Sequence, residues 1–210
     1  MNQSDMSDKS DKLHPSSPPR VILPHGGYRR LASYQTAQAV YDATVVFCNR
    51  FVDRRSRTHD QMIQAARSGV QNIAEGSMAS ATSKKTEIKL TGVARASLEE
   101  LLLDYEDYLR QRGLRLWPKD SPEALEVRGK CRSDRSDLSD RSDRSDRSDP
   151  YSIATASPEV AANTLICLIN QASYLLRRQL EKLERQFLET GGVTERLYRA
   201  RRQSRGDHWQ

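Results

Sequence analysis

The sequence predicts an all-α protein, an up-down-up-down four-helix bundle with a long disordered insertion before its fourth helix and a short C-terminal helix. Apolar residues recur at steps of three and four through four long segments, which are bounded by residues that cap helices. Only 36% of the 210 residues are hydrophobic, and the mean hydropathy is −0.78. This composition favours one compact helical core with a sizeable unfolded remainder.

The first helix is expected from about Leu31 to Phe51. It follows an arm, residues 1–27, whose Ser, Asp, Lys and Pro content predicts disorder. Six residues of this helix form one stripe: Tyr34, Ala37, Tyr41, Thr44, Cys48 and Phe51. Val45, Val46 and Phe47 widen the stripe.

The second helix is expected to begin at Thr58 as its cap and to end at Gly76, a residue suited to the left-handed position after a helix. The third begins near Ser83 and runs to about Gln111, with Gly113 able to close it. Small residues dominate the seam between the two helices, so their backbones can approach closely. The expected core residues are Ile73, Leu98, Leu101, Leu168 and Leu176.

The insertion, residues 114–156, is predicted to be irregular. It contains an Arg-Ser-Asp repeat from Arg132 to Asp149 with five Arg and six Asp, a near-neutral tract with nothing to bury. Long surface insertions cost little closure entropy, so a solvated, length-tolerant linker is expected.

The fourth helix begins with Ser157 as its cap and Pro158 in its first turn, and it ends at Gly191 and Gly192. Residues 164–169 are apolar all round, so other helices must cover several sides or a second subunit must do so. This feature predicts a homo-oligomer. The bundle would span 28–190, and a basic suffix, 191–210, would hold a short helix from about Thr194 to Arg202.

Three segments carry a resemblance to a known family: Asn72 to Gly76, Ala94 to Leu101, and Glu189 to Tyr198. The first two resemble the four-helix-bundle proteins encoded in 23S ribosomal RNA intervening sequences, and the third is similar to the suffix of one branch. The same fold resembles the accessory variability determinant of diversity-generating retroelements. That likeness implies a pentameric barrel that binds nucleic acid and associates with a reverse transcriptase.

A net charge of +6 and an isoelectric point near 9.3 favour an anionic partner. No apolar run approaches the length of a membrane span, so nucleic acid, RNA or DNA, is preferred to a membrane. Three clusters are candidate binding residues. We call them the turn cluster (Arg54, Arg55, Arg57), the lysine cluster (Lys84, Lys85, Lys89) and the suffix cluster (Arg196, Arg199, Arg201, Arg202).

Two other interpretations remain open for these surfaces. Each cluster is also explained by a solvated charged face. For the protein as a whole, a purely protein-binding helical scaffold is the alternative to nucleic-acid binding. A polar group on the seam between the second and third helices could likewise form a site, but we expect it to fix helix register. Its members are Ser68, Asn72, Glu75, Gly76 and Ser97.

The sequence contains no recognisable catalytic or metal-binding motif, so no enzyme, cofactor or metal is expected. One enzymatic alternative remains, because Arg54 and His59 have the Arg-x4-His spacing of the HEPN ribonucleases. The three cysteines, Cys48, Cys131 and Cys167, have no paired spacing. The first thirty residues lack a signal-peptide pattern, and a cytoplasmic protein with free thiols is therefore expected.

Overall fold

The computed structural model describes residues 27–136 and 151–206, with side chains from 27 to 131 and from 151 to 202. These residues form a short 3-10 helix, η1 (Tyr28–Arg30), and α-helices, with no strand among them. The α-helices are α1 (Ala32–Phe51), α2 (Arg57–Ala79), α3 (Lys84–Gln111), α4 (Pro122–Ser136), α5 (Pro158–Thr190) and α6 (Val193–Gly206). The prediction of an all-α protein is confirmed for this part of the chain.

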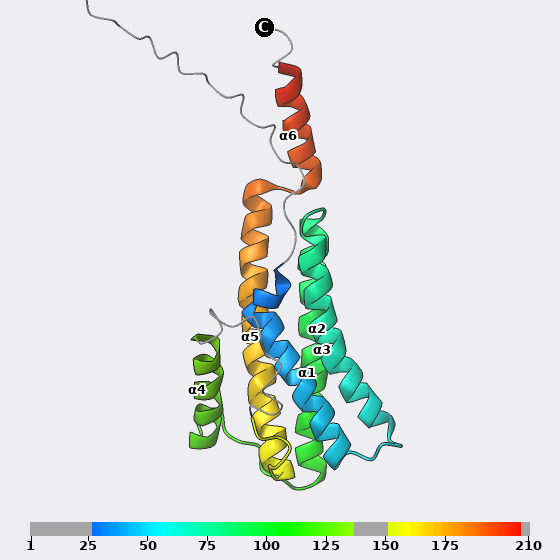
Figure 1. Cartoon of the computed structure of the whole chain (residues 1–210), viewed down its shortest axis with the longest axis vertical. Coiled ribbons are helices and arrows are strands. Elements are labelled where there is room, and N and C mark those ends of the chain that lie inside the picture. Colours follow the sequence, from blue (N-terminus) through cyan, green and yellow to red (C-terminus); the bar gives the residue numbers. More distant parts are fainter. Residues whose placement is uncertain (1–26, 137–150, 207–210) are drawn as a thin grey trace, which may run out of the picture.

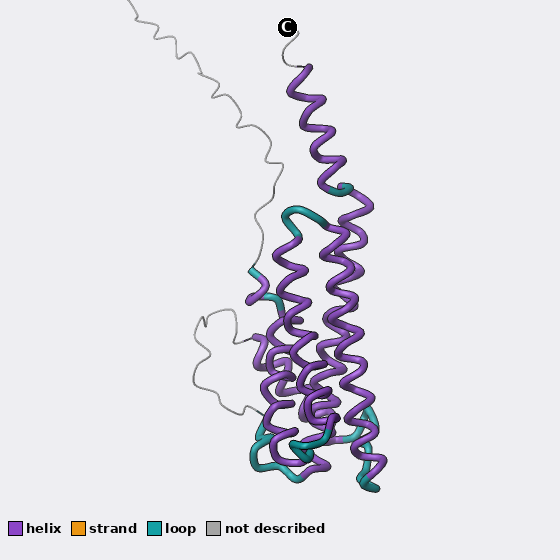
Figure 2. Tube along the Cα trace, turned by 90° about the vertical axis from the view of Figure 1, so that its right-hand side faces the viewer, coloured by secondary structure: helices purple, strands orange, loops and turns teal. Residues whose placement is uncertain are grey.

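Four long helices lie side by side, each packed on its neighbours in chain order (Figure 1). Helix α2 packs between α1 and α3, and α5 closes the group by packing on α3 and α1. Helix α4 lies on the outer side of α5. Helix α6 extends beyond the end of the group that holds the α2–α3 turn, and the view in Figure 2 shows the same projection.

The core lies between α1, α2, α3 and α5 and contains all five expected core residues. None of Ile73, Leu98, Leu101, Leu168 and Leu176 exposes more than 1% of its surface. Phe47, expected only to widen the stripe of α1, is fully buried. Its ring centroid lies 4.9 Å from those of both Tyr105 and Tyr108 on α3. Edge-to-face aromatic contacts therefore join α1 to α3.

The predicted serine caps begin both α3 and α5. The Ser83 Oγ accepts a hydrogen bond from the Thr86 backbone N–H at 3.1 Å, and Ser157 Oγ accepts one from Val160 N–H at 3.3 Å. Gly113 follows α3 with φ 63°, as its predicted closing role requires.

The predicted cap and the predicted end of the second helix are wrong, whereas its expected start near Thr58 agrees with α2, which begins at Arg57. Ser56, not Thr58, caps α2, because its hydroxyl accepts the Thr58 N–H. Helix α2 also continues through Gly76 to Ala79. A Cβ on Gly76 would lie 3.3 Å from the Leu90 Cβ, so this glycine allows α2 and α3 to approach closely and is not a helix terminator.

The expectation of irregular structure through residues 114–156 is also wrong in part. Helix α4 occupies Pro122–Ser136 and packs on α5. Ala124, Val127 and Cys131 are buried at steps of three and four, which is a short apolar stripe. The Arg-Ser-Asp repeat begins in the last turn of α4, and its residues 137–149 lie outside the described part, as do residues 1–26 of the predicted disordered arm.

Residues 164–169, which are apolar on all sides of the helix, are covered by other helices of the same chain. Thr164, Leu165, Ile166, Leu168 and Ile169 are buried, and Cys167 is half-buried. Helices α1 and α3 cover the inner sides of α5, and α4 covers the outer side. The apolar circumference of α5 therefore does not require a second subunit at this position, because α4 covers its outer side.

Candidate nucleic-acid interface

The three basic clusters lie at opposite ends of the helix group. The turn cluster lies at the α1–α2 turn, the lysine cluster begins α3 at the other end, and the suffix cluster is on the projecting α6 (Figure 1). Helix α2 separates the two ends by 23 residues, about 35 Å at the rise of an α-helix. A single chain therefore does not present the clusters as one surface.

All three arginines of the turn cluster are exposed. The turn is held by its polar neighbours: Asp53 Oδ1 accepts the Arg55 backbone N–H at 2.9 Å, and Ser56 caps α2. Among the described side chains, no carboxylate forms an ion pair with Arg54, Arg55 or Arg57. Three guanidinium groups on a fixed turn are thus open to an anion.

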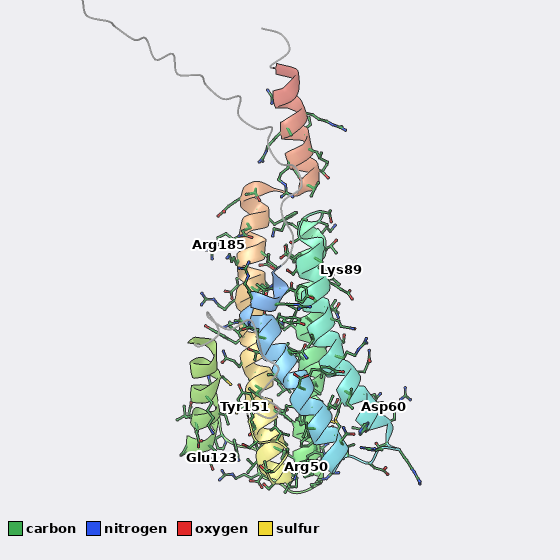
Figure 3. All side chains as sticks on the ribbon, in the orientation of Figure 1. Arg50, Asp60, Lys89, Glu123, Tyr151 and Arg185 are labelled. Carbon is green, nitrogen blue, oxygen red and sulfur yellow. The ribbon has the colours of Figure 1, made fainter. Side chains whose placement is uncertain are left out.

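The lysine cluster is smaller than the sequence predicts. The Lys84 Nζ lies 2.7 Å from Glu87 Oε2, and both side chains are largely buried, at 16% and 10% exposure. This contact at the start of α3 ties the Lys84 ammonium to a carboxylate, so it does not join the binding surface. Lys85 and Lys89 remain exposed, and Figure 3 marks Lys89 on the upper half of α3.

The suffix cluster projects with α6. The Glu195 Oε2 accepts the Gly192 backbone N–H at 2.8 Å, which caps the helix. Arg199, Arg201 and Arg202 are exposed, and no described carboxylate pairs with them. Arg196 is half-buried, and its Nε and Nη2 have no hydrogen-bond partner. The positive charge of α6 is therefore unbalanced within the described chain.

The polar group at the α2–α3 seam forms the predicted network in part. The hydroxyls of Ser68 and Ser97 are 3.0 Å apart, and Asn72 Nδ2 donates to both the carbonyl and the hydroxyl of Ser68. Gly76 contributes only close packing, and Glu75 is exposed and outside the network. These polar atoms are satisfied by one another, which suits a contact that fixes helix register.

An open hollow of about 510 Å³ lies beside this network. Helices α2 and α3 supply its lining: Arg57, Asp60, Gln61, Gln64, Ala65, Ser68, Ser97 and Glu100. Two carboxylates against one guanidinium make the hollow a poor place for a phosphate. The hollow was not predictable from the sequence, because its lining residues are spread over two helices.

A second missed feature is an acidic stretch on the half of α3 nearer the turn cluster. Its members are Glu99, Glu100, Asp104, Glu106 and Asp107. Burial raises the pKa of Asp104, with a further contribution from the negative charges of Glu100 and Asp107. The Glu-Glu and Glu-Asp pairs were visible in the sequence, but their common face required the helix register.

The Arg54–His59 spacing does not produce an open ribonuclease-like site. Arg54 is exposed, whereas the His59 side chain is only 11% exposed. Its Nδ1 lies 3.3 Å from Asp60 Oδ1, and its Nε2 is buried without a partner. A general base must reach the proton that it removes, and this imidazole faces the protein interior.

The remaining reactive side chains offer no evident chemistry. Burial raises the pKa of Cys48 to about 12 and that of Cys167 to about 11, so both thiols are protonated at neutral pH. The described residues contain no cluster of His, Cys, Asp and Glu able to hold a metal ion. No helix within the described ranges has the length and apolarity needed to cross a membrane.

Comparison with protein-family models, curated proteins and solved structures gives no match.

Proposed function

We propose that this protein is a non-enzymatic accessory protein that binds nucleic acid through arginines and lysines at both ends of a four-helix bundle. Helices α1, α2, α3 and α5 would form the up-down-up-down bundle, with α4 and the Arg-Ser-Asp repeat inserted before α5. The resemblance to ribosomal intervening-sequence and retroelement accessory proteins supports the same proposal. It adds a homo-oligomer and a nucleic-acid enzyme, such as a reverse transcriptase, as partner. The absence of paired cysteine spacing supports a cytoplasmic location.

One observation carries the proposal. Six exposed arginines of the turn and suffix clusters pair with no described carboxylate: Arg54, Arg55, Arg57, Arg199, Arg201 and Arg202. Some arginines elsewhere are neutralised, for example Arg110 by Asp107, Arg115 by Glu123 and Arg178 by Glu181. Others, such as Arg67, Arg95 and Arg185, stand singly without a described carboxylate partner. Three unpaired guanidinium groups within four consecutive residues, at 54–57 and again at 199–202, favour an external anion.

Phosphate is the anion that this arrangement suits. A guanidinium donates two parallel hydrogen bonds to phosphate oxygens, and each neutralised phosphate releases counterions. Such contacts position a nucleic acid without reading its sequence. Binding is therefore expected to be tolerant of sequence and steeply dependent on salt.

The test is fluorescence anisotropy with labelled RNA and DNA between about 50 and 200 mM salt. Replacing Arg54, Arg55 and Arg57 together by Gln should weaken binding and flatten the salt dependence, by about 0.9 in the logarithmic slope for each phosphate that is no longer neutralised. The matched control removes three paired arginines, Arg110, Arg115 and Arg178, and should retain the slope. Wild-type protein that binds neither nucleic acid at low salt would refute the proposal and favour the protein-only scaffold.

A further inference from the structure

The outer face of α3 carries exposed apolar residues that lead into the acidic stretch. Val93, Ala96 and Leu103 recur at steps of three and seven, so they lie on one side of the helix. Val93 is 40% exposed and Leu103 is 58% exposed. We call these three residues the α3 stripe. Carboxylates surround the lower part of the α3 stripe. Among the described side chains, Asp107 is the only one of these carboxylates that forms an ion pair, and its partner is Arg110. An apolar stripe with excess negative charge suits a basic amphipathic helix.

Helix α6 has the complementary pattern. Val193, Leu197 and Ala200 follow the spacing of one helical face, and Arg196 and Arg201 lie on its two flanks. Leu197 is 40% exposed. The charge of α6 is opposite to that of the α3 stripe's surroundings, and Arg201 is exposed with no carboxylate partner among the described side chains.

The same chain cannot make this contact. Leu103 is 19 residues after the start of α3, which places it about 28 Å from the α2–α3 turn. Helix α6 begins near that end of the group, and only Gly191 and Gly192 join it to α5. Leu197 is one turn into α6, about 6 Å along its axis, so a folded-back α6 would leave it far short of Leu103.

We propose that α6 of one copy docks on the α3 stripe of a second copy. In this contact Leu197 covers the exposed Leu103, and Arg196 and Arg201 meet the surrounding carboxylates. The contact joins two different surfaces, so it is heterologous, and successive copies either close into a ring or continue as a filament.

This docking has a consequence for the two separated basic ends, which rests on the function proposed above. Glu100, beside the α3 stripe, lines the same hollow as Arg57. A docked α6 therefore lies next to the neighbour's turn cluster. Arg199 and Arg202, on the side of α6 away from its apolar face, would then extend that cluster into one basic surface built from two copies.

The test is light scattering of the full chain at micromolar concentration without nucleic acid. Wild type should form an oligomer. Leu103→Ser on α3 and, separately, Arg196→Glu with Arg201→Glu on α6 should each yield monomers with unchanged helicity. Leu125→Ser is the matched control, because Leu125 is a similarly exposed leucine, at 49%, on α4. It should assemble as wild type does.

A mixing experiment separates docking from a general loss of stability. The α3 variant has an intact α6, and the α6 variant has an intact α3 stripe, so an equimolar mixture should form a species of two chains and grow no further. A monomeric wild type, or variants that assemble as wild type does, would overturn the inference. So would a mixture that stays monomeric although both variants are folded by circular dichroism.

Nucleic-acid binding is measured on the same samples. If assembly follows these expectations but no variant or wild type binds RNA or DNA, the proposed function fails and the docking stands. If the α6 variant assembles normally and loses only binding, α6 is solely a nucleic-acid arm and the docking inference is wrong.

Discussion

The hydroxyl of Tyr105 on α3 donates a hydrogen bond to Thr44 Oγ1 on α1, at 3.1 Å, and neither residue is exposed to solvent. Burial raises the pKa of Tyr105 well above its ordinary value, so this phenol remains a donor across the physiological range. The bond joins two helices within an otherwise apolar layer. It therefore restricts their register, whereas apolar contacts alone tolerate sliding.

Removing this donor should destabilise the protein. We expect Tyr105→Phe to lower the free energy of unfolding by about 1–3 kcal/mol, because the Thr44 hydroxyl stays buried without its partner. Urea unfolding followed by circular dichroism measures the change. Tyr108→Phe is the control, since the Tyr108 hydroxyl has no hydrogen bond among the described residues. Equal destabilisation of the two variants would contradict this account.

Two glycines on facing helices should respond in opposite ways to alanine. A Cβ on Gly69 would lie 2.9 Å from Leu98 Cδ2, so Gly69→Ala should cost about 1–3 kcal/mol through overpacking. Gly92 is also helical, but nothing lies within 4 Å of its Cβ position. Gly92→Ala should therefore stabilise the protein by about 0.5–1 kcal/mol. If Gly69→Ala raised the thermal midpoint as Gly92→Ala does, the α2–α3 contact would be looser than the structure indicates.

Stability should fall at alkaline pH. The pKa of Cys48 rises from 9.0 to about 12 on folding, chiefly through burial and secondarily through the charge of Asp104. Between these values the folded state holds a proton that the unfolded state has released, so the free energy of unfolding decreases as pH rises. Well below pH 9.0 this thiol is protonated in both states and contributes no pH dependence. Cys48→Ala should make the decline shallower in urea titrations over that range, and an unchanged slope would refute the assignment.

The repeat and α4 should differ in their importance for stability. Deleting residues 137–149 should leave the thermal midpoint nearly unchanged, because that part of the tract is strongly polar and Leu138 is its only apolar residue. Val127→Asp should lower the midpoint clearly, since Val127 is only 9% exposed in the apolar cluster that includes residues of α5. A deletion as damaging as Val127→Asp would place the repeat within the fold.

Incubation with labelled RNA tests the ribonuclease alternative. We expect no cleavage by the wild type and none by His59→Ala, because the His59 Nε2 is buried. Arg54→Ala is the companion variant on the exposed side of the same motif. Cleavage that both variants abolish would revive this alternative and require the turn to open.

The helices that begin with clear capping residues were predictable from the sequence. Ser83 and the Ser157–Pro158 pair have local capping chemistry, which is the same whatever surrounds the helix. Helix α4 was missed because its stripe of Ala124, Val127 and Cys131 is short and interrupted by charged residues. A short helix of this kind is only marginally stable alone, and packing on α5 supplies the rest of its stabilisation.

The candidate site was predictable in residue type but not in position. The basic clusters are evident as runs of Arg and Lys, and the seam between α2 and α3 was correctly expected to contain Ser68, Asn72 and Ser97. The pairing of Lys84 with Glu87 and the exposure of Glu75 required coordinates. Charge composition does not reveal which cations are already neutralised by a neighbour.

The sequence by itself determined the all-α class, the helix starts at Ser83 and Ser157, and the identity of the core leucines, because periodicity and capping act within a few residues. Only the tertiary structure decided that Gly76 lies inside a helix, that α4 covers the outer side of α5, and that the basic clusters occupy opposite ends. Those outcomes depend on contacts between residues far apart in the chain. Such contacts are set by how whole helices pack, and no local pattern specifies them.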